Sequence, residues 1–289
     1  PQQDFELSRA AQDTAPAPPT IRVWEADGAE MVFVPVGEFT MGSEELGDDE
    51  RPVHQVYLDG FWIDRYEVTN ERFARFVAAT GYQTEAEKRG WGWVSPPSEA
   101  GKQREGEEVE GADWRHPRGP GSSIEHKMDH PVVLVSWNDA YTYCQWAGKH
   151  LPSEAQWEKA ARGTDERRYA WGDEFDSARA NTRESNRGGT TPVGSFSPQG
   201  DSPYGASDMT GNIWEWVADW YDSGYYSQSP SANPTGPITG VYKVLRGGSW
   251  PFDEVYARTV FRHNVRPDYT YDFVAVSYTH LTLPTIYSV

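Results

Sequence analysis

A tryptophan-rich block followed by a glycine turn constrains the fold of this chain more than any other feature. Residues 208–220 include Trp214, Trp216 and Trp220, and residues 246–250 read Arg-Gly-Gly-Ser-Trp. The whole chain holds 27 glycines, 13 tryptophans and 16 tyrosines but only 37% hydrophobic residues. This composition predicts a loop-rich globule whose core depends on aromatic side chains, with long helices contributing little to its stability.

The charge balance narrows the classes of partner. A formal net charge of −18 argues against nucleic acid, because nothing here could neutralise a run of phosphates, and against an anionic membrane surface. We interpret the acidic surface as a solubility feature, with cation binding as the alternative. No run of about 18 apolar residues predicts membrane insertion. A single cysteine excludes an intrachain disulfide, so pairing does not indicate a compartment.

Most of the chain is expected to form one domain. Residues 1–20 end in a Pro/Ala-rich stretch that is typical of a linker, and a chain that begins at Pro1 is interpreted as a fragment or a processed form. The domain is predicted over residues 21–275. Within it, the charged, Gly/Pro-rich residues 95–125 predict a long insertion loop.

The pattern within this domain predicts an α+β fold with few helices, short strands and much irregular loop. β-rich runs cover residues 31–42 and 53–63, and little regular periodicity follows residue 162. Three helices carry their own start signals. They are an N-cap at Thr69 or Asn70 with a stop at Gly81, a capping box at Ser136 and Asp139, and another at Ser153 and Gln156.

Several strings resemble the formylglycine-generating enzyme (sulfatase-modifying factor) family. Besides residues 208–220 and 246–250, they are residues 64–70, 113–117, 130–137, 144–149 and 151–163, and the resemblance spans about residues 32–274. It implies a modified C-type lectin-like domain with calcium in its loops. Members of this family oxidise a cysteine of a client sulfatase with two cysteines that follow the Arg-Gly-Gly-Ser string.

The two cysteines of the family are absent from this chain. Their positions are filled by Phe252 and Ala257, so no catalytic residue is predicted. The one thiol, Cys144, lies on the apolar stripe of a predicted helix, which indicates a buried and inert cysteine. His54, His116 and His130 lie in scaffold strings and are interpreted as structural histidines.

The resemblance also implies structural calcium. One ion would be held by the side chains of Asp208 and Glu215 and by the backbone oxygens of Gly211 and Ile213, a hard oxygen set that suits Ca²⁺. A second site matches only at Asn181 and the Thr182 carbonyl, and Glu184, Ser185 and Asn186 are candidates for its remaining ligand. The alternative for either cluster is a solvated acidic turn.

Residues 251–274 surround the missing cysteines with aromatic and adaptable polar residues, a composition typical of a binding surface. The segment resembles the variable region of diversity-generating retroelement proteins, which use the same lectin-like fold. The alternative is ordinary drift in a cysteine-less relative. The predicted ligand-binding residues are Trp250, Phe252, Asp253, Val255, Tyr256, Phe261, His263, Asn264, Tyr269, Tyr271 and Asp272.

The C-terminal residues 276–289 do not continue the family pattern, which would end in a Gly-Phe-Arg strand. They resemble the translation of a transposase-type sequencing-library adapter, so we predict that they are not native and that the true terminal strand is missing. The alternative is a genuine terminal strand, because the segment is rich in strand-forming residues.

Three functions remain open at this point. The first is a non-catalytic protein that binds a protein or glycan ligand through residues 250–274, with calcium as a structural brace. The second is a formylglycine-generating enzyme or related oxygenase that acts without the usual cysteine pair. The third is an accessory module tethered through residues 1–20. Fold alone does not decide among them.

Overall fold

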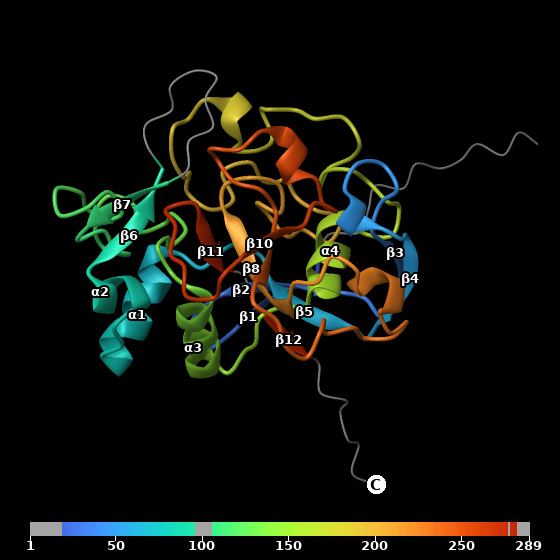
Figure 1. The fold of residues 1–289 in the computed structure, drawn as a ribbon, viewed down its shortest axis with the longest axis horizontal. Coiled ribbons are helices and arrows are strands. Elements are labelled where there is room, and N and C mark those ends of the chain that lie inside the picture. The colour runs from blue at the N-terminus through green and yellow to red at the C-terminus, as the bar shows by residue number, and fades with distance from the viewer. Residues whose placement is uncertain (1–18, 96–105, 277, 282–289) are drawn as a thin grey trace, which may run out of the picture.

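The computed structural model describes residues 19–95, 106–276 and 278–281. The predicted linker therefore lies almost wholly outside the described residues. Figure 1 shows one body in which short strands and long irregular segments surround a few short helices. The predicted α+β class is confirmed. No helix of the described residues is long and apolar enough to cross a membrane.

Two four-stranded sheets form the centre. The first is antiparallel throughout, in the order β1 (Ile21–Val23), β2 (Glu30–Val34), β5 (Phe61–Asp64), β12 (Thr279–Leu281). The second has the order β10 (His263–Val265), β9 (Lys243–Arg246), β8 (Trp214–Trp220), β11 (Val274–Val276), with β11 parallel to β8. The tryptophan-rich block thus becomes an inner strand of the second sheet.

Two hairpin-like pairs complete the strands, and they correct two predictions. β3 (Gly37–Met41) pairs with β4 (His54–Leu58), whereas β5 joins another sheet, so the single strand predicted over residues 53–63 is wrong. The strand is interrupted at Asp59 and Gly60, and a Cβ added to Gly60 would lie 2.9 Å from the Phe33 ring. The predicted insertion loop contains β7 (Glu107–Glu110), paired with β6 (Trp91–Val94).

The three predicted helices are confirmed with their caps. α1 (Asn70–Thr80) has Thr69 as its N-cap and Gly81, whose φ is 69°, as its C-cap. α3 (Trp137–Ala147) and α4 (Glu154–Arg162) have both hydrogen bonds of their predicted capping boxes. Sequence reasoning missed α2 (Glu85–Arg89), which has a capping box of its own. The described residues also contain the 3₁₀ turns η1 (Asp48–Glu50), η2 (Arg183–Ser185), η3 (Tyr225–Gln228) and η4 (Glu254–Ala257).

Aromatic side chains fill the core, as the composition predicts. One cluster joins α1 and α3 to the second sheet through Trp114, Trp214 and Trp216. Another lies around α4, every residue of which is buried, and includes Trp157. Helix α4 therefore runs through the interior, and its charged residues require partners there.

The C-terminal segment takes part in the fold. The Tyr278 ring is buried and stacks on Tyr143 with centroids 5.0 Å apart, and β12 pairs with β5. This geometry is the one expected if the segment is a genuine terminal strand, the alternative to an adapter translation. The adapter origin of residues 276–289 remains a prediction, since a strand-forming sequence could occupy an edge whatever its source.

Hydrogen exchange can test whether this strand forms. The Asp64 amide donates to the Tyr278 carbonyl at 2.8 Å, and the Thr279 amide donates to the His150 carbonyl at 2.8 Å. We expect both amides to exchange slowly in the 289-residue chain, and Asp64 to lose protection in a chain that ends at residue 276. The Phe33 amide, on the far side of β5 in strand β2, is the control. Fast exchange of Thr279 in the longer chain would show that β12 does not form.

Candidate functional site

The Arg-Gly-Gly-Ser-Trp turn docks on the tryptophan-rich block. Gly247 and Gly248 have φ of 96° and 76°, a left-handed conformation that favours glycine. A Cβ added to Gly248 would lie 2.6 Å from the Cα atom of Ala257, so the turn requires a residue without a side chain there. The Gly211 amide donates to the Gly247 carbonyl at 2.7 Å. The turn therefore lies directly between the candidate calcium residues and the position of one missing cysteine.

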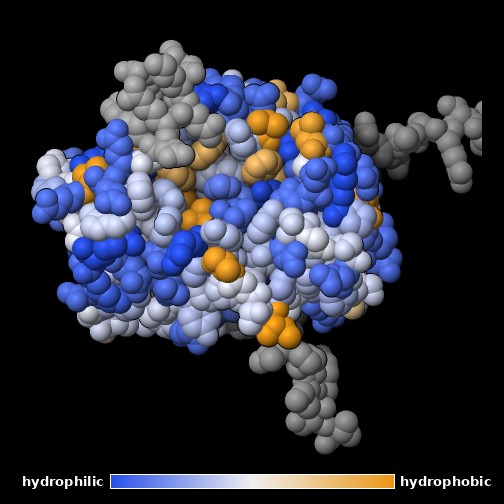
Figure 2. Space-filling view, in the orientation of Figure 1, coloured by the Kyte–Doolittle hydropathy of each residue, from blue (hydrophilic) through white to orange (hydrophobic). Residues whose placement is uncertain are grey.

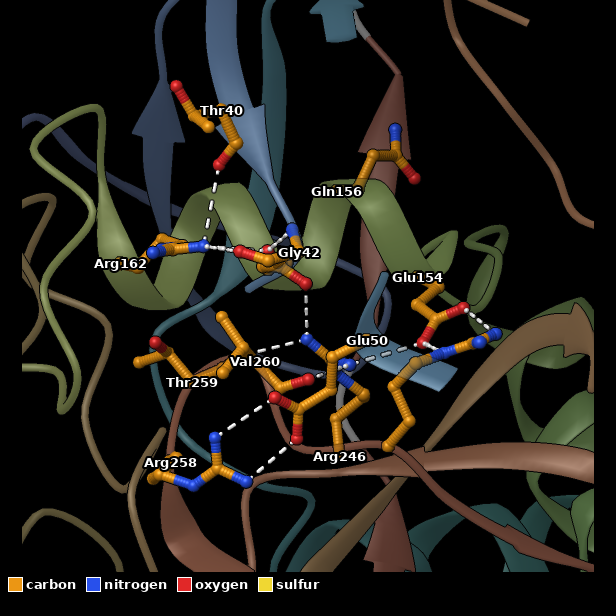
Figure 3. Close-up of polar contacts among 12 residues, drawn as sticks. Thr40, Gly42, Glu50, Glu154, Gln156, Arg162, Arg246, Arg258, Thr259 and Val260 are labelled. Atoms are coloured by element: carbon orange, nitrogen blue, oxygen red, sulfur yellow. Dashed lines mark hydrogen bonds and ion pairs between the residues drawn. The ribbon is translucent and has the colours of Figure 1, made fainter. Parts of the chain in front are cut away.

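Buried ion pairs hold the framework of this region (Figure 3). Arg246 contacts Glu154 at 3.1 Å and Glu158 at 2.6 Å, both on α4. Arg262 also contacts Glu154, at 2.7 Å. Burial disfavours the charge on Glu154, but the two guanidinium groups together hold its pKa below the usual value.

A second pair anchors the segment that carries Ala257. Arg258 contacts the Glu50 carboxylate from η1 through two hydrogen bonds of 3.0 and 2.7 Å (Figure 3). Both side chains are nearly inaccessible to solvent. These ion pairs therefore anchor residues 246–262 to α4 and η1.

Aromatic rings occupy the region of the missing cysteines. The Phe252 ring lies edge-on to Trp214, Tyr256 and Phe273, with centroids 5.7, 5.7 and 5.3 Å away. Ala257 is fully buried. The row of rings continues from Phe273 to Tyr271 at 4.9 Å. The site is thus packed with hydrocarbon where the family has two thiols.

The remaining thiol is far from reactive. Cys144 lies on α3 and is fully buried, which confirms the predicted burial. Burial raises the pKa of the Cys144 thiol well above its usual value. The reactive thiolate form is therefore suppressed.

The eleven predicted ligand-binding residues differ in exposure. Val255 is the one exposed residue among them, with 37% of its surface accessible, whereas Trp250 and Asp272 are buried and line a cleft instead. Burial lowers the pKa of His263 to about 4, so this histidine is neutral at physiological pH. The other residues are half-buried: Phe252, Asp253, Tyr256, Phe261, His263, Asn264, Tyr269 and Tyr271. Figure 2 shows a mostly hydrophilic face with small, separate hydrophobic patches.

The first predicted calcium set is compatible with a cation. Asp208 is buried at φ 60°, and burial raises the pKa of its carboxyl to about 7. Glu215 is buried on β8, and its Oε2 accepts a bond from the Trp157 indole at 2.9 Å. A Cβ added to Gly247 would lie 3.8 Å from both Glu215 Oε1 and the Ile213 carbonyl oxygen. These two oxygens therefore face one small space that glycine leaves open.

A third buried acid near this set was missed by sequence reasoning. Burial, together with the charges of Asp208 and Glu215, raises the pKa of Glu67 well above its usual value. Glu67 Oε2 accepts a bond from Asn212 at 2.9 Å, and Oε1 has no hydrogen-bond partner among the described residues. The only signal was its place in the string of residues 64–70. Three neighbouring buried acids require protons or a cation.

Acidic side chains alone do not make a metal centre here. Within the described ranges, no group of three or more His, Cys, Asp or Glu side chains is placed to hold a metal ion. A calcium ion at the first set would therefore depend on the carbonyls of Gly211 and Ile213 as well as the carboxylates.

The oxygens of the second predicted set accept hydrogen bonds within the protein, as Asp208 Oδ2 and Glu215 Oε2 of the first set also do. The Asn181 Oδ1 atom and the Thr182 carbonyl both accept hydrogen bonds from the Ser185 hydroxyl, at 3.2 and 2.7 Å. Glu184, a candidate for the remaining ligand, instead accepts a bond from the Glu254 amide. The oxygens of this set are thus already engaged within the protein.

Comparison with known proteins agrees with this architecture. The model of the sulfatase-modifying factor enzyme 1-like domain matches residues 19–276. A formylglycine-generating enzyme of Thermomonospora curvata is 44% identical over 257 residues, which cover 78% of this chain and 84% of the relative. A mouse relative named inactive C-alpha-formylglycine-generating enzyme 2 is 38% identical, with 80% and 78% covered.

Solved structures show the same fold. PvdO from Pseudomonas aeruginosa superposes with a TM-score of 0.71 at 28% identity, covering 91% of this chain and 98% of PvdO. The Treponema denticola variable protein 1 superposes with a TM-score of 0.66 at 18% identity, covering 90% and 98%. On the family match, the identity to its relatives and the shared fold, the chain belongs to the formylglycine-generating enzyme family of sulfatase-modifying factor domains.

Proposed function

We propose that this chain is a non-catalytic binding protein built on the formylglycine-generating enzyme scaffold. The observation that carries the proposal is the replacement of both family cysteines, by Phe252 and by the buried Ala257. The surface of residues 251–274 would contact a protein or glycan ligand. Its half-buried aromatic rings offer contact area at a low entropic cost.

The chemistry of the family explains why the replacements matter. Oxidation of a cysteine requires a thiolate, or a soft metal held by thiolates, to bring oxygen and the substrate sulfur together. Phenyl and methyl groups provide neither. Cys144, the one thiol in the sequence, is buried in α3 and cannot reach a substrate without local unfolding.

One of the comparisons supports a role without catalysis. The mouse relative at 38% identity is named as inactive, so the scaffold persists in at least one relative described in that way. The Treponema denticola protein supports the fold alone, since it is 18% identical. A retroelement-diversified surface on residues 251–274 therefore remains a proposal. Sequencing of the locus would support it by finding a near-copy of these codons that differs mainly at adenines.

The second candidate is an enzyme of the same family that acts without the cysteine pair. The 44% identity to the Thermomonospora curvata enzyme favours it. Such an enzyme would need another way to activate oxygen, so stoichiometric copper or iron in the purified protein would favour this candidate over the binding role.

A peptide assay separates the two functions. We expect no formylglycine when the purified chain is incubated in air with copper, a thiol reductant and a peptide containing Cys-x-Pro-x-Arg, because no accessible thiol binds the substrate. Mass spectrometry of the peptide is the readout, with the Thermomonospora curvata enzyme as positive control. Conversion by this chain, retained in a Cys144→Ser variant, would refute the binding proposal and establish an enzyme without a cysteine mechanism.

Calcium would act as a brace in either case. The residues that would hold it are Asp208, Glu215 and the carbonyls of Gly211 and Ile213, with Glu67 nearby. The ion would supply positive charge to a buried acidic cluster and connect the tryptophan-rich block to the glycine turn.

A further inference from the structure

A polar cleft lies beside the Arg-Gly-Gly-Ser-Trp turn, separate from the aromatic rings around Phe252. Its volume is about 130 Å³. Three buried residues from distant parts of the chain line it: Asn70 at the start of α1, Trp250 after the glycine turn, and Asp272 before β11.

Each of these residues presents a buried polar atom without a hydrogen-bond partner among the described residues, although one of the three, on Asp272, lies within ion-pair distance of Arg118. They are Asn70 Oδ1, Trp250 Nε1 and Asp272 Oδ2. Other contacts hold two of these side chains in place. The Asn70 side-chain nitrogen Nδ2 donates to the Lys127 carbonyl at 2.8 Å, and Asp272 Oδ1 accepts from the Ser95 backbone amide at 2.9 Å. Sixteen buried side-chain atoms of the described residues lack such a partner, and three of them meet at this one cleft, where a ligand or water can satisfy them.

The charges around the cleft argue against an ionic ligand. Arg118 lies 3.3 Å from Asp272 Oδ2 and places its guanidinium 5.6 Å from the centre of the Trp250 ring. Lys127 lies at the rim. An anion would approach the oxygens of Asn70 and Asp272, and a cation would approach Arg118 and Lys127. A neutral ligand avoids both penalties.

The ligand must donate to two oxygens and accept from one indole N–H at the same place. Neighbouring hydroxyl groups do this, because each hydroxyl both donates and accepts. A single trans peptide group carries one donor and one acceptor pointing in opposite directions. Three hydroxyl side chains, Ser122, Ser123 and Thr190, extend the polar lining.

We infer that this cleft binds one neutral sugar residue of a glycan through Asn70, Trp250 and Asp272. The inference rests on the proposed binding function and deepens it, because it narrows the protein or glycan ligand to a glycan. The sugar would lie at the side of residues 251–274, so that the exposed part of that segment could contact the rest of the glycan.

Titration of the purified chain with the methyl glycosides of glucose, galactose, mannose and N-acetylglucosamine tests the inference. Calorimetry and saturation-transfer NMR are the readouts. We expect at least one glycoside to bind with a millimolar Kd, and the Trp250→Phe variant, which keeps a ring but lacks the N–H, to bind it about five- to tenfold more weakly. Asp272→Asn, which exchanges an acceptor for a donor, is expected to act similarly and serves if Trp250→Phe does not fold.

Val36→Ala is the control, since Val36 is exposed and lies outside both residues 251–274 and the cleft lining. It should bind the glycoside with unchanged affinity. The inference is overturned if none of the four glycosides binds, if both cleft variants bind as tightly as the parent chain, or if acetyl-asparagine amide binds in place of the sugars. Because the peptide assay for formylglycine is independent, failure of the sugar titration alone leaves the non-catalytic function standing.

Discussion

Replacement of Arg246 by methionine is expected to lower the free energy of unfolding by about 3–5 kcal/mol. Arg246 is fully buried and makes ion pairs with Glu154 and Glu158 on α4. Its guanidinium also donates to the carbonyls of Val260 and Thr259 at 3.1 and 2.6 Å. Methionine fills part of the volume, but Glu154 and Glu158 are each left with a single arginine partner, Arg262 and Arg162, and two buried carbonyls lose this donor.

Urea unfolding of the variant and the parent chain measures this change. Arg75→Met is the control, because Arg75 forms an exposed pair with Glu71 on α1 that contributes at most about 0.5 kcal/mol. Loss of less than about 1 kcal/mol in Arg246→Met would show that water reaches the Glu154 and Glu158 carboxylates in solution. The network would then not fix the segment around Ala257.

Elements with local signals could be predicted from the sequence. Ser136 with Asp139, and Ser153 with Gln156, each satisfy orphan amides of the helix that follows, so the start of that helix is specified within four residues. The burial of Cys144 follows in the same way from its place on an apolar stripe. The missed α2 carries the same kind of box at Thr84 and Glu87, so its signal was available in the sequence.

Features that depend on long-range contacts could not be predicted. β4 and β5 are separated by two residues but join different sheets, and Gly60 between them lies against the ring of Phe33. Glu67 approaches Asp208 and Glu215 only when α1 docks beside the tryptophan-rich block. A local sequence pattern carries no information about contacts between residues that are distant in the sequence.

At the candidate site, too, positions could be predicted from the sequence but side-chain contacts and burial could not. The family resemblance placed the two cysteine positions, but it did not show that the Phe252 ring would contact Trp214 and Phe273. Trp250 and Asp272 were predicted to belong to one binding surface with Phe252, whereas both are buried and line the cleft. Exposure of a side chain is a property of the folded surface and not of residue type.

Removal of calcium is expected to lower the melting temperature by about 5–10 °C. Without the ion, Asp208, Glu67 and Glu215 place three acids in the interior, where burial raises the pKa of the first two. A bound ion stabilises only the folded state, in which the carbonyls of Gly211 and Ile213 are held near the carboxylates. Differential scanning calorimetry with excess calcium and with a chelator measures the difference.

Two variants locate this effect. Glu215→Gln keeps an oxygen for the Trp157 indole but removes a charged ligand, so its melting temperature should respond little to calcium. Asp219→Asn, on the same strand, changes another buried acid whose pKa burial raises to about 7, and its response to calcium should match that of the parent chain. Equal melting temperatures of the parent chain in calcium and in chelator would show that protons alone neutralise the acidic cluster. The glycine turn would then be held on the tryptophan-rich block by the hydrogen bond from Gly211 to Gly247 and its neighbours, without a metal.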